Sequence, residues 1–192
     1  MNRYGNQNPT YRYSTEYQYS EGAFASEISA NYALTCHPWQ ELVLQDWLAV
    51  DETGKLLNSF CLLEVPRQNG KTGLVQGRSN AGMLLYNEKI IYTAHLQKTS
   101  TETFEEMAVF FDTPKLSKYV KDIKTAIGRE QIILKSGARI KFLARTRSGG
   151  RGQHGDLLIF DEAQELDDDQ QASFLPAISA SLNPQTILLG TP

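Results

Sequence analysis

One stretch of the chain constrains the fold more than any other. The apolar run Phe60–Leu63 leads into a polar turn that ends in Gly70, Lys71 and Thr72, and a segment with helical character follows. A buried strand, a turn ending in Gly-Lys-Thr and a helix together favour phosphate binding. The turn directs backbone N–H groups at the phosphates, and the helix N-terminus adds partial positive charge. The sequence therefore predicts a phosphate-binding loop.

The residues of this turn have distinct expected roles. Lys71 would reach the β- and γ-phosphate oxygens of ATP, and the Thr72 hydroxyl would ligate Mg²⁺. The usual pattern has Gly five residues before Gly70, whereas this chain has Val65 there. A plain strand–turn–helix junction is the alternative interpretation. The predicted nucleotide contacts are Pro66, Arg67, Gln68, Asn69, Gly70, Lys71 and Thr72.

A second motif lies downstream, where the apolar run Leu157–Phe160 is followed by Asp161 and Glu162. Four apolar residues predict a strand buried on both faces. Carboxylates at the end of such a strand are costly unless a cation neutralises them. Asp161 would hold Mg²⁺, directly or through water, while Glu162 would orient and deprotonate the attacking water. The order of the two motifs predicts ATP and Mg²⁺ as cofactors.

Composition and charge agree with this interpretation. The 192 residues are 41% hydrophobic, which gives room for one sizeable domain and a tail. All 19 Lys and Arg residues occur at or before Arg151, whereas residues 152–192 carry seven acids. A basic block meeting an acidic one is expected where phosphates and a metal site adjoin. Without an apolar run typical of a membrane span or secretion signal, we expect the protein to act inside a cell.

The first thirty residues form a poor candidate for folding. Residues 1–30 hold five of the nine tyrosines among Asn, Gln, Ser and Thr, without helical or strand periodicity. Such a segment buries too little apolar surface to offset its ordering entropy, so we expect a disordered tail. The remaining residues, 31–192, are predicted to form the ATPase domain. Cys36 and Cys61 lack metal-ligand spacing, and a reduced setting suits both.

The other elements follow from periodicity. A helix is expected after Pro38, and within it Gln40 either reads the edge of an adenine base or is simply solvated. The expected strands and helices, in chain order, are strand Ser59–Val65, helix Lys71–Leu85, strand Lys89–His95, helix Gln97–Phe111, a short helix at Lys115–Lys121, strands Gln131–Lys135 and Arg139–Ala144, an irregular loop Arg145–Gly155, a helix ending near Leu182 and strand Gln185–Gly190. Alternating strands and helices predict an α/β fold with a mainly parallel central sheet flanked by helices.

Three segments together, Pro66–Thr72, Leu158–Ala163 and Leu188–Pro192, resemble the ATPase domain of phage terminase large subunits, the DNA-packaging motors of tailed bacteriophages. The resemblance covers roughly residues 35–192. It implies a P-loop NTPase of the additional-strand type, similar to RecA and helicases. It also implies that His37–Gln40 recognises adenine and that Thr191 belongs to a motif coupling hydrolysis to motion.

The resemblance further implies partners. These are double-stranded DNA, the capsid portal and a small terminase subunit, with full-length subunits forming a ring in the host cell cytoplasm. Such proteins carry a C-terminal nuclease, which we expect to be absent here because the chain stops after the last motif. A neighbouring subunit would supply an arginine finger. Arg151 before Gly152 matches best, Arg145 and Arg147 are rivals, and Arg67 in the phosphate-binding loop would act from the same chain.

Two other functions stay open. A superfamily 2 helicase or translocase shares the Gly-Lys-Thr loop and an Asp-Glu-Ala-x motif, here Asp161–Gln164. A domain that binds nucleotide without turnover would instead be a structural or assembly piece. The sequence following Pro192 separates terminase from helicase. The ATPase rate with and without DNA separates the enzymes from the binding module.

Overall fold

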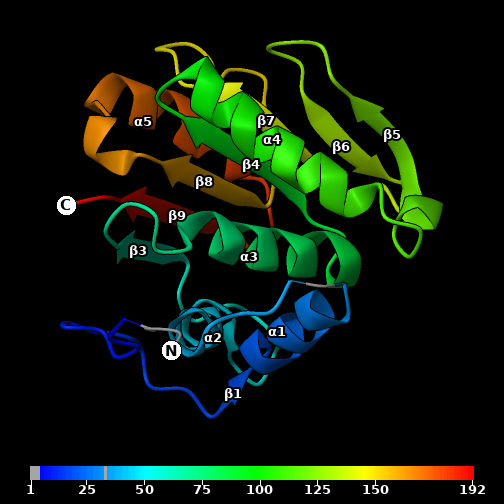
Figure 1. Ribbon diagram of the computed structural model, residues 1–192. Helices are drawn as coiled ribbons and strands as arrows, with labels where there is room; N and C mark the ends of the chain where they lie inside the picture. Colours follow the sequence, from blue (N-terminus) through cyan, green and yellow to red (C-terminus); the bar gives the residue numbers. More distant parts are fainter. Residues whose placement is uncertain (1–4, 33) are drawn as a thin grey trace.

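The computed structural model describes residues 5–32 and 34–192. Its centre is a seven-stranded sheet in the order β3-β9-β8-β4-β7-β6-β5 (Figure 1). The strands of this sheet are β3 (Phe60–Glu64), β4 (Lys89–Ala94), β5 (Val120–Lys124), β6 (Gln131–Leu134), β7 (Arg139–Ala144), β8 (Leu157–Asp161) and β9 (Gln185–Gly190). Every neighbouring pair from β3 to β7 is parallel, and β6 and β5 extend the sheet as antiparallel strands. The predicted α/β class with a mainly parallel sheet is confirmed.

The central strands are apolar because both faces of the sheet are covered. All five residues of β8 are buried, and five of the six residues of β4 are buried. Strands with helices on both faces need continuous apolar runs, not alternation. This explains why Leu157–Phe160 could be recognised from the sequence as a strand.

Helices form layers on the two faces (Figure 1). Helices α3 (Lys71–Leu85) and α4 (Gln97–Phe111) pack on one face, where Leu74 and Met107 join the largest apolar cluster. Helix α5 (Asp168–Phe174) and the 3-10 turn η3 (Leu175–Ile178) cover the other face with Phe174 and Ile178. The parallel connections therefore bring the carboxyl ends of the strands to one edge, where ligands of such sheets bind.

The later part of the expected disordered tail, residues 19–30, contains regular structure, and residues 1–4 of that tail lie outside the described residues. Short strands β1 (Tyr19–Ser20) and β2 (Ala49–Val50) pair, and helix α1 (Gly22–Asn31) packs on α2 (Pro38–Trp47). A Cβ at Gly22 would lie 2.3 Å from the Gln45 backbone nitrogen, so the two helices touch through a residue without a side chain. Helix α1 is built from small residues and lacks a clear apolar period, which is why periodicity did not reveal it.

Two further elements differ from expectation. In place of the expected helix Lys115–Lys121, the chain forms the 3-10 turn η1 (Ser117–Tyr119), and β5 follows directly. The antiparallel pairing of β5 with β6 outweighs the local helical propensity of this segment. The expected long helix toward Leu182 ends at Phe174 and continues as η3, which contains Pro176. Another 3-10 turn, η2 (Ala163–Glu165), follows β8. In the described part of the chain, no helix combines the length and apolar character needed to cross a membrane.

Candidate nucleotide site

The predicted phosphate-binding loop lies between β3 and α3, at the carboxyl edge of the sheet. Two residues of the loop have a left-handed backbone conformation, Gln68 with φ 60° and Gly70 with φ 85°. Glycine adopts positive φ without steric cost, whereas Gln68 does so at some expense. The Asn69 side chain braces the turn by donating to the carbonyl oxygens of Pro66 and Arg67, at 3.2 and 3.0 Å. The loop is therefore preformed, and the side chain of Arg67 remains exposed.

The two sequence motifs meet through an ion pair. The Lys71 ammonium lies 2.7 Å from Asp161 Oδ1, and the side chains are only 18% and 9% exposed. The pair joins the first turn of α3 to the end of β8, residues far apart in the chain. Its attraction is stronger than that of a surface pair because the surrounding protein excludes most water.

Asp161 has two more partners. The Tyr92 hydroxyl donates to Oδ2 at 2.6 Å, and the Glu162 backbone N–H donates to Oδ1 at 2.8 Å. Tyr92 is fully buried, and its pKa is raised well above the ordinary value by burial and then by the adjacent Asp161 charge. Tyr92 therefore stays a neutral donor, which orients the Asp161 carboxylate toward Lys71.

Glu162 is held in an unusual conformation beside Asp161. Its backbone is left-handed, with φ 53° and ψ 50°, a region that non-glycine residues enter at a cost of about 1–3 kcal/mol. One carboxylate oxygen, Oε2, is buried and has no hydrogen-bond partner among residues 5–32 and 34–192. A buried acceptor of this kind is expensive unless something binds it. Strain and an unsatisfied acceptor together are typical of a residue kept for chemistry.

Arg145 binds the backbone of the strained turn at Asp161 and Glu162. Its side chain is buried and donates from one amino group to the carbonyl oxygens of Asp161 and Thr93, and from the other to the Glu162 carbonyl at 2.8 Å. Burial lowers the pKa of Arg145, and the Glu162 and Asp161 charges oppose that effect. A guanidinium committed to three backbone carbonyls cannot extend to another subunit. The structure therefore argues against Arg145 as the finger.

Gln40 also has partners within the protein. Its Oε1 accepts from the His37 backbone N–H, and its Nε2 donates to the Gly70 carbonyl, both at 2.7 Å. The residue is 3% exposed, and it links the start of α2 to the phosphate-binding loop. Adenine recognition by Gln40 stays a prediction, and in this conformation both ends of the amide are already used.

Thr72 and Thr191 border the same edge. Thr72 follows Lys71 in the first turn of α3 and is half-buried. The Thr191 backbone N–H donates to the Gln164 side chain at 3.3 Å, which connects the end of β9 to the turn after β8. The Asp161 carboxylate and the Thr72 hydroxyl are oxygen ligands of the kind that Mg²⁺ prefers, and beside them the buried Glu162 Oε2 atom has no hydrogen-bond partner among the described residues. The donor set fits a hydrated Mg²⁺.

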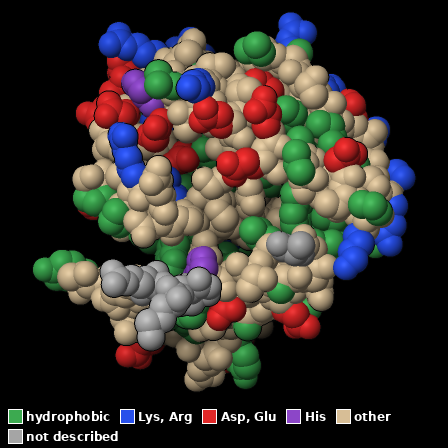
Figure 2. Space-filling view, viewed as in Figure 1, with side chains coloured by type: hydrophobic (Ala, Val, Ile, Leu, Met, Phe, Trp, Pro, Cys, Tyr) green, Lys and Arg blue, Asp and Glu red, His purple; other side chains and the backbone are tan. Residues whose placement is uncertain are grey.

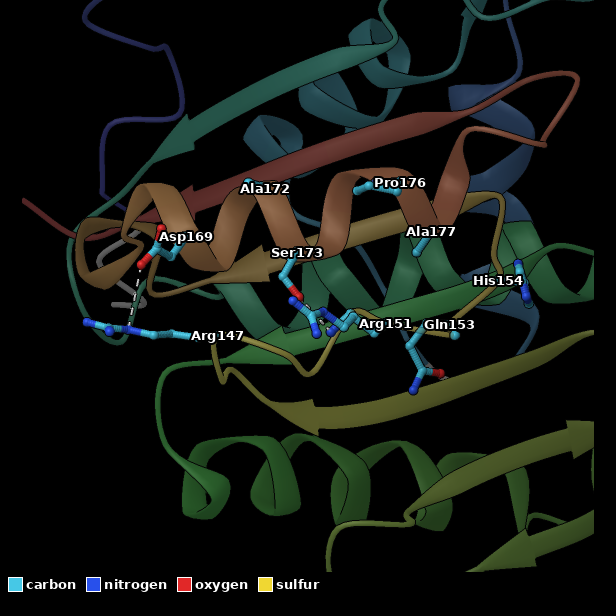
Figure 3. A pocket seen from close by; sticks show the side chains of 11 residues that line it. Arg147, Arg151, Gln153, His154, Asp169, Ala172, Ser173, Pro176 and Ala177 are labelled. Atoms are coloured by element: carbon cyan, nitrogen blue, oxygen red, sulfur yellow. Dashed lines mark hydrogen bonds and ion pairs between the residues drawn. The ribbon is translucent and has the colours of Figure 1, made fainter.

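The remaining arginines lie in the loop between β7 and β8. This loop packs along α5 and η3 and encloses an open pocket of about 610 Å³ (Figure 3). Gly150 allows the approach, since a Cβ there would lie 2.2 Å from the Ser173 carbonyl oxygen. Arg147 lies 3.8 Å from Asp169, and both side chains are exposed. Arg151 is also exposed, and among the described residues it forms no ion pair with Asp161 or Glu162.

The structure brings together Lys71, Asp161 and Glu162, which the sequence predicted as site residues, and adds buried groups beside them that the sequence did not indicate. Tyr92 lies inside a strand and Arg145 directly after one, and neither carries a local pattern that distinguishes it. Their proximity to Asp161 arises only because β8 lies beside β4, which in turn lies beside β7.

The fold of this chain resembles known proteins, although its sequence matches none of the family models or curated proteins. Among solved structures, the large terminase of bacteriophage HK97 is similar at a TM-score of 0.73 and 22% identity over 90% of this chain and 38% of that one. The large terminase of a thermophilic bacteriophage, solved in complex with ADP, gives a TM-score of 0.51 at 16% identity over 70% of this chain and 33% of that one.

A helicase is similar as well. The UvsW helicase of bacteriophage T4 gives a TM-score of 0.53 at 11% identity over 81% of this chain and 52% of that one. This chain thus spans well under two thirds of each protein's length. At these identities the similarity concerns the fold. The chain has the P-loop ATPase fold, and its structural neighbours include the ATPase domains of phage large terminases.

Proposed function

We propose that the chain is the ATPase motor domain of a terminase-type machine that hydrolyses ATP to drive double-stranded DNA into a capsid. The observation that carries the proposal is the pairing of Lys71 with Asp161 beside a strained Glu162 with an unsatisfied carboxylate oxygen. This is the arrangement that phosphoryl transfer to water needs, with a phosphate-binding cation, a metal-binding acid and a base. The similar fold of the terminase solved with ADP supports nucleotide as the ligand.

The residues divide the work as follows. Lys71 leaves Asp161 and binds the β- and γ-phosphate oxygens, while the loop N–H groups from Gln68 to Gly70 bind the rest of the phosphate chain. Thr72 and Asp161 would hold Mg²⁺, which would neutralise negative charge on the phosphates. Glu162 orients the attacking water and accepts its proton, a role that an otherwise unpaired carboxylate oxygen suits.

The test compares two isosteric changes. Glu162→Gln should keep ATP affinity and lose hydrolysis by a factor of about 10²–10⁴, because an amide cannot accept the proton. Asp161→Asn should weaken ATP binding in the presence of Mg²⁺ and change it little with EDTA. Nucleotide affinity is measured with a fluorescent ATP analogue and turnover by phosphate release, with Asp112→Asn as an exposed control. Equal loss of affinity in both variants would refute the assigned roles.

A second candidate is a superfamily 2 helicase or translocase fragment, which the similar fold of the T4 helicase favours. The two functions predict different products. A packaging motor stimulated by duplex DNA leaves the strands paired, whereas a helicase releases a labelled strand. A chain that binds ATP and shows no turnover with either substrate would be a binding module.

The proposed motor implies protein partners and a further domain. The portal, a small terminase subunit and a ring of identical subunits would be its partners in the host cytoplasm, and a nuclease domain would belong to the full-length protein. The arginine finger would come from a neighbouring subunit. Arg151 and Arg147 are the candidates for the finger because both are exposed, in contrast to Arg145.

A further inference from the structure

The α5 side of the sheet is not covered along its whole width. Helix α5 and η3 lie over β8 and the Ile91 position of β4. The outer strands β7, β6 and β5 continue beyond them, and Gln131 and Ile133 remain half-buried on this side. The opposite face of the same strands is closed by α4, where Ile140 and Phe142 are buried in the core.

The strand register determines which side chains share the open face. Ile91 aligns with Lys141, Lys141 with Gln131, and Gln131 with Lys124. In the adjacent row, Lys89 aligns with Arg139. Neighbouring strands lie about 4.8 Å apart, so a row from β4 to β5 is about 14 Å long. The cations Lys89, Lys124, Arg139 and Lys141 therefore form one patch, which we call the basic face.

The charges of the basic face lack acidic partners. None of its four cations forms an ion pair within residues 5–32 and 34–192. Lys141 donates instead to the neutral Gln153 side chain at 2.9 Å, and Arg139 to the His154 carbonyl at 3.5 Å. Two acids lie beside the face: the exposed Asp122, through its alignment with Ile133, and Asp156, whose carboxylate accepts from the Lys89 backbone N–H at 2.9 Å. Cations placed together without neutralisation repel each other, and a bound polyanion relieves that repulsion.

The titration of Lys141 is consistent with this crowding. Its pKa is lowered by burial first, and then by the neighbouring charges of Arg139 and Lys124. The loop beside the face adds the exposed Arg151 next to Gln153 (Figure 3). In Figure 2, Lys and Arg side chains also line the edge of the molecule at β5. Three of the four cations of the basic face thus lie on β5 and β7.

We propose that the basic face is a binding surface for the phosphate backbone of double-stranded DNA, separate from the nucleotide site. Duplex DNA carries one charge per about 1.7 Å, or about eight charges over a 14 Å row, which exceeds the four cations available. The residues aligned on the face include no aromatic side chain on which an unpaired base could stack. Contact is therefore with phosphates and independent of base sequence.

The inference rests on the proposed function, which supplies DNA as the partner, and it is tested by the salt dependence of binding. The affinity for a labelled 30-bp duplex is measured by fluorescence anisotropy at several salt concentrations. With four phosphate contacts, log affinity should fall with log salt at a slope of about −3.6, or about 10²-fold between 50 and 200 mM. Lys124→Gln combined with Lys141→Gln should reduce the slope to about −1.8, a loss of only about 10-fold.

The control is Lys55→Gln combined with Lys98→Gln, which removes the same charge from exposed positions elsewhere. Its slope should equal that of the wild type, and thermal unfolding confirms that both double variants fold. If the wild type binds duplex DNA and the basic-face variant binds with an unchanged slope, the inference is wrong while the motor proposal stands.

Other outcomes separate the two proposals further. Absence of duplex binding by the wild type, alongside ATP hydrolysis, would overturn both the basic face and DNA translocation. The Lys124→Gln, Lys141→Gln variant could also lose as much affinity for a single-stranded oligonucleotide of the same length as for the duplex. That result would identify a general nucleic-acid surface and contradict the duplex assignment. If the Lys124→Gln, Lys141→Gln variant changes its oligomeric state while its DNA affinity stays the same, the face contacts an acidic surface of a second copy. That result would overturn the inference.

Discussion

The buried guanidinium of Arg145 offers the sharpest test of how the turn at Asp161 and Glu162 is held in place. Arg145 donates to the Asp161, Glu162 and Thr93 carbonyls, and the Glu162 bond measures 2.8 Å. Hydrogen bonds from a charged donor contribute about 1.5–3 kcal/mol each, so the two bonds to Asp161 and Glu162 are worth about 3–6 kcal/mol. Removing the buried charge returns part of this, because its desolvation cost disappears. We expect Arg145→Met to destabilise the fold by about 3 kcal/mol.

Activity should fall for a separate reason. Without Arg145, Glu162 can leave its left-handed conformation, which releases about 1–3 kcal/mol of strain and moves the carboxylate away from the attacking water. The turnover number should therefore drop about 10- to 100-fold at constant ATP affinity, because Lys71 and the loop remain in place. Arg145→Lys can satisfy fewer carbonyls and should lie between wild type and Arg145→Met.

The assays are thermal unfolding, nucleotide affinity and phosphate release. For a chain of this size, about 3 kcal/mol corresponds to a Tm decrease of about 6–12 °C. Arg129→Met, in an exposed turn, is the matched control and should change neither quantity. An Arg145→Met protein with wild-type Tm and turnover would refute the positioning role. Loss of turnover without loss of stability would show instead that Arg145 contacts the reacting groups.

The remaining predictions concern the finger and a buried thiol. Arg151→Ala and Glu162→Gln should each be inactive alone, and mixing them should restore phosphate release if the arginine acts on a neighbouring subunit, where it can raise turnover by about 10³–10⁵. A mixture that stays inactive while wild type works at any dilution would place the arginine within one chain and favour Arg67. Burial raises the pKa of Cys61 from 9.0 to about 12, so the unfolded thiol ionises first and stability falls as pH rises between these values. The stability difference between wild type and Cys61→Ala, measured in urea, should change by about 2 kcal/mol from pH 8.5 to 10.5, and no change would contradict burial of the thiol.

Local sequence determined much of the secondary structure around the candidate site. The strand, turn and helix around Gly70 are readable because each depends on neighbours in the chain, namely an apolar run, positive φ at glycine and helical spacing. The same holds for β8, whose Leu157–Phe160 run is apolar because both faces of the sheet are covered. The predicted arrangement of a mainly parallel sheet with helices on both faces follows from the alternation of such elements.

Other features depended on tertiary structure. Helix α1 has no strong apolar period and folds because Gly22 lets it approach α2 closely, a contact between residues that no local pattern connects. The long helix predicted toward Leu182 ends instead at Phe174, and the following turn η3 packs on β8.

The site itself shows the division most clearly. The sequence alone predicted Lys71, Asp161 and Glu162 as site residues, because polar residues that follow a buried strand or a tight turn can be recognised from the local pattern. Tyr92 and Arg145, which hold Asp161 and the Glu162 backbone in place, could not be named in this way. They act through strand order, which brings β4, β7 and β8 side by side. Strand order is decided by the burial of the whole sheet, and burial is a property of the folded chain and not of any one segment.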